Sequence, residues 1–167
     1  MRTPTAAAGS ALFFAVAPGV VAGLIPWWLT GWRVHGTLSH LAPVRIAGLV
    51  MLVLGAIVLV QAFARFAAEG HGTPAPVAPA ERLVIGGLYR HVRNPMYIGV
   101  LSVVLGQASL YRSRDLLIYA ACFWLAAHLF VVFYEEPTLK RQFGPNYEDY
   151  SRQVPRWIPR PPRSSPR

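Results

Sequence analysis

Long apolar stretches without a charged residue dominate this chain. Three of them, at about residues 11–29, 46–64 and 116–134, approach the roughly 20 residues that an α-helix needs to cross a hydrocarbon core of about 30 Å. A fourth, residues 96–111, is uncharged but shorter, about 24 Å long as a helix. The pattern predicts an all-α integral membrane protein with about four transmembrane helices. The third helix is marginal in length, or has one end buried in protein.

Two pairs of glycines repeat at the same spacing in neighbouring apolar stretches. Gly48 and Gly55 lie seven residues apart in the second stretch, and Gly99 and Gly106 do so in the third. Small residues at this spacing let helix backbones approach closely. We therefore expect the two helices to pack closely along a seam formed by these glycines. Close packing alone explains the spacing of the glycines, without any functional role.

The connection between the second and third stretches is long and poor in helix formers. Prolines and glycines alternate over residues 70–79, which cannot be helical, and residues 82–85 are expected to be extended up to a turn at Gly86-Gly87. A connection of about 25 residues without its own helices is unusual in a small domain. We expect a functional loop.

Breaker residues also follow the last apolar stretch. Pro137 is expected to kink or restart the helix, and Gly144 with the proline after it to stop it. Residues 154–159 read as an extended strap at the membrane surface and residues 160–167 as a disordered basic tail. Residues 1–159 are therefore expected to form a single domain.

Composition and charge agree with a membrane location. The 167 residues are 54% hydrophobic, with a mean hydropathy of +0.38, which is too apolar for an ordinary soluble domain. With four spans, only Arg33, Arg45, Arg112 and Arg114 of the 16 basic residues lie on one side, and the other twelve share the side of both termini. This bias predicts cytoplasmic termini, and contact with anionic lipid headgroups rather than nucleic acid explains the net charge of +9.

Two further features limit the possibilities. Ala15-Val16-Ala17 resembles a signal-peptide cleavage site, but the apolar stretch continues to Leu29, so we expect a retained span. The single cysteine, Cys122, excludes an internal disulfide and any metal cluster built from cysteines, and we expect no metal.

A carboxylate pair, Glu135-Glu136, closes the last apolar stretch. It is either a solvated pair beside Lys140 and Arg141 or a carboxylate held at the membrane face to bind an ammonium or sulfonium centre. Ionisable groups at such depth are costly, which favours a partner for them.

Other candidate residues keep two interpretations each. Arg93 is a lipid-facing anchor or a clamp whose planar fork binds a carboxylate. Tyr89 and Tyr97 are aromatic residues of the membrane interface or an aromatic wall that attracts a cation. His128, about two turns inside the last stretch, is a proton acceptor or a histidine hydrogen-bonded to another helix.

Several short motifs occur in a fixed order along the second half of the chain. They read Gly-x-Tyr, Arg-Asn-Pro-Met-Tyr-x-Gly, Glu-Glu-x-x-Leu-x-x-x-Phe-Gly-x-x-Tyr-x-x-Tyr and Val-Pro-Arg-x-x-Pro. This set, between Gly72 and Pro159, resembles the superfamily of isoprenylcysteine carboxyl methyltransferases and phospholipid methyltransferases. The resemblance implies an all-helical integral membrane enzyme that uses S-adenosylmethionine, bound from the cytosolic side and enclosed by the long loop and the C-terminal segment.

The resemblance also implies a set of site residues. Arg93 stands where the family has its arginine, and Glu136 or His128 is the candidate base for an acceptor that must lose a proton. The residues matching the family's cofactor site are Leu83, Val84, Tyr89, Arg93, Asn94, Pro95, Met96, Tyr97, Glu135 and Glu136.

Two departures from the family pattern bear on the acceptor. Asn94 replaces the histidine of many isoprenylcysteine enzymes and is more similar to phospholipid methyltransferases and many bacterial members, which suggests a bacterial inner membrane. Val131-Val132 replaces an arginine that the eukaryotic carboxyl methyltransferases use for their substrate.

We therefore expect methyl transfer to a small amphipathic or lipidic acceptor, with an amine or thiol favoured over a prenylcysteine carboxylate. Two alternatives are a membrane sterol-type reductase, which would need a nicotinamide site, and a non-catalytic membrane protein that retains the scaffold.

Overall fold

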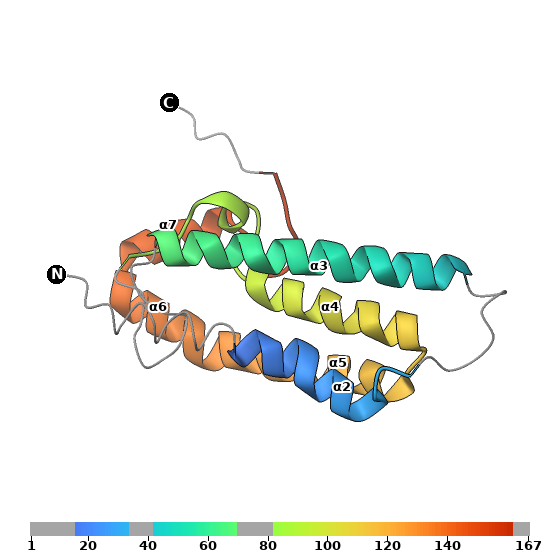
Figure 1. The fold of residues 1–167 in the computed structure, drawn as a ribbon. Coiled ribbons are helices and arrows are strands. Elements are labelled where there is room, and N and C mark those ends of the chain that lie inside the picture. The colour runs from blue at the N-terminus through green and yellow to red at the C-terminus, as the bar shows by residue number, and fades with distance from the viewer. Residues whose placement is uncertain (1–15, 34–41, 70–81, 162–167) are drawn as a thin grey trace.

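The computed structural model describes residues 16–33, 42–69 and 82–161, and this part of the chain is helical and contains no strand (Figure 1). The first helix runs over Val16–Thr30 and includes a π-helical turn. In chain order the elements are η1 (Val20–Leu24), α2 (Ile25–Thr30), α3 (Ala42–Glu69), the 3₁₀ turn η2 (Gly87–Arg90), α4 (Pro95–Tyr111), α5 (Arg114–Phe130), the π-helical η3 (Val131–Glu135), α6 (Glu136–Phe143) and α7 (Pro145–Gln153). The predicted all-α class is confirmed.

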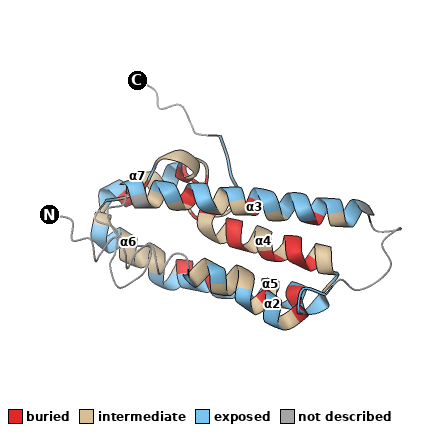
Figure 2. Ribbon diagram, in the orientation of Figure 1, coloured by how far each residue is buried: buried red, intermediate tan, exposed pale blue. Residues whose placement is uncertain are grey.

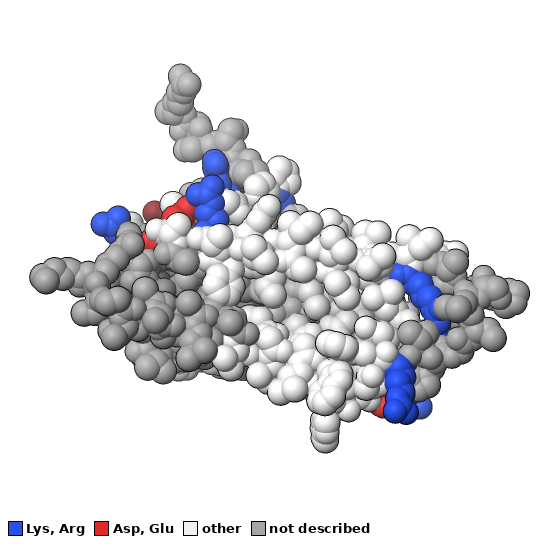
Figure 3. All heavy atoms as spheres, in the orientation of Figure 1, with Lys and Arg blue, Asp and Glu red and all other residues white. Residues whose placement is uncertain are grey.

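Two of these helices are long and apolar enough to cross a membrane. They are Pro43–Phe66 and Arg114–Phe143, and the apolar helices Val16–Thr30 and Pro95–Tyr111 are shorter. In Figure 3 the charged side chains gather at the two ends of the bundle, with an uncharged belt between them. Large apolar side chains on α3, such as Leu54 and Val60, are exposed, as expected for a face in contact with lipid. Much of α3 is coloured as exposed in Figure 2.

Helix α4 is the centre of the bundle, and α3 lies along it in an antiparallel arrangement (Figure 1). The two glycine pairs face each other. A Cβ added at Gly106 would lie 2.7 Å from the carbonyl oxygen of Gly48, and one at Gly55 would lie 2.9 Å from that of Gly99. The predicted glycine seam is confirmed, because only glycine leaves room for the opposite backbone.

The first helix passes Pro26 without ending. Proline has no N–H, so carbonyls one turn earlier lose their donor. The side chains of the neighbouring helices replace it: Gln107 Nε2 donates to the carbonyl of Ala22 at 2.6 Å, and the Tyr119 hydroxyl donates to that of Val21 at 2.8 Å. These bonds join the π-helical turn to α4 and α5, which is how proline is tolerated within a membrane bundle.

Pro137 is predicted to kink or restart the last helix, and a restart is observed: the α-helical segment α6 begins at Glu136 with Pro137 in its first turn. The helix continues from Arg114 to Phe143, and the π-helical turn η3 lies directly before the acidic pair. A π-turn widens the helix by one residue, which accommodates the proline ring and its missing N–H. Gly144, with a positive φ of 51°, ends the helix as predicted.

The C-terminal strap, residues 154–161, runs back along the segment that precedes α4. The backbone N–H of Arg93 donates to the carbonyl of Pro155 at 2.9 Å, and that of Arg160 donates to the carbonyl of His91 at 3.0 Å. Arg160 thus still belongs to the strap. The rest of the predicted tail, residues 162–167, and the proline-rich residues 70–79 lie outside the described residues.

Candidate active site

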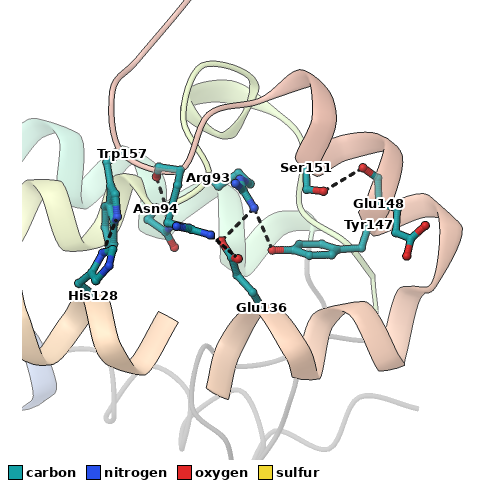
Figure 4. Close-up of polar contacts among 9 residues, drawn as sticks. Arg93, Asn94, His128, Glu136, Tyr147, Glu148, Ser151 and Trp157 are labelled. Atoms are coloured by element: carbon teal, nitrogen blue, oxygen red, sulfur yellow. Dashed lines mark hydrogen bonds and ion pairs between the residues drawn. The ribbon is translucent and has the colours of Figure 1, made fainter. Parts of the chain in front are cut away.

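The predicted site residues meet at one end of the bundle. Three segments come together there: the loop before α4, the junction of η3 with α6, and α7 with the strap behind it (Figure 4). The loop reaches this end because Glu69 Oε2, in the last turn of α3, accepts a hydrogen bond from the N–H of Gly86 at 3.0 Å. The short helix α4 also begins beside this site. Asn94, the residue that directly precedes its first turn, is buried there.

Glu136 is held by two arginines. Arg156 of the strap donates to its two oxygens from Nε at 2.6 Å and from Nη2 at 2.8 Å, and Arg93 donates from Nη1 at 2.9 Å (Figure 4). The hydrogen bond to Glu136 raises the pKa of Arg156. Such forked, charge-assisted bonds are the stronger kind. Both oxygens of Glu136 are therefore engaged within the protein.

Glu135 has a different partner from its neighbour. Consecutive residues of a helix point in directions about 100° apart. Glu135 is therefore turned toward α4, where its Oε2 accepts a hydrogen bond from the hydroxyl of Tyr97 at 3.1 Å. The acidic pair thus divides into one carboxylate fixed to the strap and one facing the helix bundle.

His128 is joined to the strap as well. Its Nδ1 accepts a hydrogen bond from Nε1 of Trp157 at 3.1 Å (Figure 4). The Trp157 ring also lies 4.4 Å from that of Trp124 and 6.3 Å from that of Tyr97, measured between centroids. An indole N–H only donates, so in this arrangement the proton of a neutral His128 is on Nε2. The strap is anchored in an aromatic pocket between α4 and α5.

Asn94 and the tyrosines of α7 complete the connections. The side-chain amide of Asn94, which is buried, donates to the carbonyl of Arg156 at 3.2 Å. Tyr147 accepts a bond of 3.4 Å from Arg93, and Tyr150 donates to the carbonyl of Tyr89 at 2.7 Å. Burial raises the pKa of all three tyrosines above the ordinary value, so they are uncharged at neutral pH.

Two cavities meet at these residues. The first, of about 180 Å³, lies at the end of the bundle between the loop, α6 and α7, and the second, of about 270 Å³, lies between the helices. Side chains from all four apolar helices line the second cavity, among them Val21, Leu59, Val100 and Phe123. The residues common to both cavities are Phe66, Tyr89, Arg93, Asn94, Phe130 and Glu135.

The predicted site residues divide between the two cavities. Pro95, Met96 and Tyr97 line only the second cavity, and His128 lines neither. The remaining predicted cofactor residues line the first: Leu83, Val84, Tyr89, Arg93, Asn94, Glu135 and Glu136. Sequence reasoning missed the roles of Arg156 and Trp157, although the Val-Pro-Arg motif of the strap already placed Arg156 among the family's landmarks.

A bundle of apolar helices with a cluster of charged and aromatic side chains at one end is typical of an integral membrane protein. A family model described as phospholipid methyltransferase matches residues 44–146, which is more than half of the chain. The chain belongs to this family, and it is therefore a methyltransferase of the membrane. No curated protein and no solved structure gives a significant match to the chain.

Proposed function

We propose that this protein transfers a methyl group from S-adenosylmethionine to the polar end of an amphipathic acceptor. The observation that carries the proposal is the wall that the two cavities share. One cavity lies at the polar end of the bundle and the other among the apolar helices. A polar cofactor and an apolar acceptor could each occupy one cavity and meet at this wall.

The first cavity suits the cofactor chemically. It offers aromatic faces from Tyr89, Tyr147 and Tyr150, and the carboxylate of Glu135. Aromatic faces bind flat rings and attract cations, and S-adenosylmethionine carries both an adenine and a sulfonium. When bound, this cofactor supplies the electrophilic methyl group. The chain's own contribution is to orient it and to exclude water, since a dry site disfavours the concentrated charge of the sulfonium relative to a transition state in which that charge is dispersed.

The second cavity suits the acceptor. Its lining is mostly aliphatic and aromatic, and its charged members, Arg93 and Glu135, lie at the shared wall. This arrangement fits a molecule with an apolar body and one polar end. The Arg93 guanidinium is already bonded to Glu136, whereas Glu135 would repel a carboxylate. An amine or thiol acceptor is therefore favoured over a prenylcysteine carboxylate.

Neither of the bases expected from the sequence is free in this arrangement. Both oxygens of Glu136 accept hydrogen bonds from arginines, and Nδ1 of His128 accepts one from Trp157. We therefore assign these two residues to holding the strap over the site.

The same proposal includes the arrangement in the membrane. All four apolar helices span a bacterial inner membrane, residues 1–159 act as one domain, and the end that carries the site faces the cytoplasm. Helix α4 is shorter than α3, and it still spans the membrane in this arrangement because its first turn is surrounded by protein. In lipid, the unpaired backbone groups of the loop before α4 would be costly.

Filling each cavity separately tests the proposal. Leu83→Trp narrows only the first cavity and Val21→Trp only the second, and both positions are half-buried. Calorimetry with S-adenosylhomocysteine should show weakened binding in Leu83→Trp and unchanged binding in Val21→Trp, while both variants lose methyl transfer. Unchanged binding and transfer in Leu83→Trp would contradict the assignment of the first cavity to the cofactor.

A further inference from the structure

Glu69, in the last turn of α3, is not among the described residues that line the two cavities, and no motif of the sequence marks it. Its Oε2 accepts a hydrogen bond from the backbone N–H of Gly86 at 3.0 Å, across 17 positions of the chain. Leu83 and Val84, just before Gly86, line the first cavity and not the second. The carboxylate of Glu69 therefore holds a segment that forms the wall of one cavity.

Gly86 leaves room for this carboxylate. A Cβ added at Gly86 would collide with Oε1 of Glu69, and it would lie 2.7 Å from both Cδ and Oε2 of the same side chain. The backbone of Gly86 is extended, with φ of −86° and ψ of 168°, a conformation that residues other than glycine also adopt. Glycine is thus needed at this position because Glu69 comes so close, and not because of its backbone angles.

Arg65 lies one turn before Glu69 on α3 and contacts the same turn of the loop. Its Nη1 donates a hydrogen bond to Oε1 of Glu69 at 3.1 Å. The next glycine, Gly87, has a positive φ of 56°, and a Cβ added there would lie 2.9 Å from Cγ of Arg65. The two side chains at the end of α3 therefore pack against both glycines of the turn.

Apolar contacts on either side of the turn also hold the loop to α3. Val84 and Tyr89 are buried in one cluster with Ala62, and Phe66 packs against this cluster. Apolar burial is non-directional, so these contacts hold the loop against the helix without fixing the direction of its backbone. A hydrogen bond requires a particular distance and angle, and one to a carboxylate is among the stronger ones. The bond from Gly86 to Glu69 therefore fixes the turn.

We propose that Glu69 is a positioning residue for the cofactor, because it fixes the Gly86-Gly87 turn and thereby places Leu83 and Val84 against the first cavity. This assignment rests on the proposed methyl transfer and extends it to a residue beyond the cavity wall. Glu69 acts through the backbone of the loop and touches neither ligand. Since Leu83 and Val84 do not line the second cavity, the loss of Glu69 should weaken cofactor binding and leave the acceptor cavity intact.

Calorimetry with S-adenosylhomocysteine tests the assignment. Glu69→Ala should weaken binding by about tenfold or more, because it removes a hydrogen bond to a charged group. Glu69→Gln keeps a side-chain oxygen that can accept from Gly86, so it should restore most of the affinity. Glu148→Gln is the matched control, since it changes an exposed carboxylate of α7 that pairs with Lys140, and it should match the wild type.

The rate of transfer should change in a way that a general loss of structure would not produce. In membranes that contain the protein, Glu69→Ala should raise the KM for labelled S-adenosylmethionine by about the same factor as it weakens binding. At saturating cofactor, the rate of label transfer to the membrane extract should stay within about twofold of the wild type. An equal loss of rate at saturating cofactor would show that Glu69 does more than place the cofactor wall.

Gly86→Ala gives the reciprocal test. Alone, its Cβ would displace the carboxylate of Glu69, so binding of S-adenosylhomocysteine should weaken about as much as in Glu69→Ala. The three atoms nearest to that Cβ all belong to Glu69. In the Glu69→Ala background, Gly86→Ala should therefore weaken binding by less than about twofold further. Losses that simply multiply in the double variant would contradict a direct effect of this contact.

The outcomes separate this assignment from the proposed function. Wild-type affinity in Glu69→Ala, a loss that Glu69→Gln does not restore, or failure of Glu69→Ala to fold would overturn the positioning role while the wild type still binds S-adenosylhomocysteine. If the wild type itself does not bind this ligand, the proposed function fails.

Discussion

Glu135 and Glu136 are adjacent in the sequence yet have separate partners. The helix turns Glu136 toward Arg93 and Arg156, and turns Glu135 toward Tyr97. The Glu136 carboxylate joins the loop and the strap to the last helix, and the Glu135 carboxylate faces the cavities. Side-chain direction, rather than proximity in the chain, therefore decides which of the two is bound by the arginines of the loop and the strap and which by the tyrosine of α4.

The ion pair between Arg156 and Glu136 should contribute measurably to stability. Arg156→Met removes two charge-assisted hydrogen bonds from a carboxylate that is 19% exposed, and we expect the free energy of unfolding to fall by about 1–2 kcal/mol. Thermal unfolding in detergent micelles measures the change.

Arg152→Met is the matched control for Arg156→Met. Arg152 is 74% exposed and its contacts to Glu148 and Asp149 are 3.8 Å or longer, so its loss should cost less than about 0.5 kcal/mol. Equal effects of the two substitutions would show that the ion pair between Arg156 and Glu136 adds nothing to stability.

Sequence reasoning reached the members of this site but not their partners. The ordered motifs placed Arg93, Tyr97 and the acidic pair in one region, because the resemblance carries positions over one by one. The partner of Glu136 lies 20 residues further on, beyond a helix and a turn. Only the path of the strap brings Arg156 back, and no local pattern encodes that path.

Among the elements, the α3–α4 pair depends most on individual residues. Gly106→Ala would place a Cβ 2.7 Å from two backbone atoms, Gly48 O and Leu52 N, which cannot move aside as a side chain can. We expect a loss of about 1–3 kcal/mol from the resulting strain. The shift of the unfolding midpoint on titration with a denaturing detergent measures it.

Gly23→Ala controls for the chemistry of the substitution. Gly23 lies in the first helix, and no atom of the described residues lies within 4 Å of an added Cβ, so alanine should leave stability unchanged or raise it by up to about 1 kcal/mol. If both variants lost stability equally, the seam would not be the cause.

The glycine seam could be predicted because a spacing of seven residues returns to the same face of a helix, and the two pairs match. The π-helical turns could not. A proline signals a break in isolation, but the bonds from Gln107 and Tyr119 to the carbonyls near Pro26 come from helices about 85 and 98 residues away. Tertiary contacts therefore override the local preference of the sequence.

At the scale of the whole molecule, the site occupies one end of a bundle whose middle is uncharged on the face that Figure 3 shows. The described basic residues of the opposite end, Arg33, Arg45, Arg112 and Arg114, form no ion pair with a described residue, whereas those near the site form several. The excess of basic residues at the site end favours its location in the cytoplasm.

Labelling of single cysteines tests this orientation. In a Cys122→Ala background, Asn146→Cys marks the site end and Arg33→Cys the opposite end, and both positions are exposed. An impermeant maleimide should label Arg33→Cys in intact spheroplasts and Asn146→Cys only after permeabilisation. The reverse pattern would place the site outside the cytoplasm.

The transfer of labelled methyl groups tests the central claim most directly. Membranes that contain the protein would be incubated with S-adenosylmethionine labelled with tritium in its methyl group, and the lipid and small-molecule extracts would be analysed by mass spectrometry. We predict label on the amine or thiol of an amphiphile, and none with Leu83→Trp, which narrows the proposed cofactor cavity. Absence of label from every extract of the wild type, or equal labelling by the variant, would contradict methyl transfer at this site.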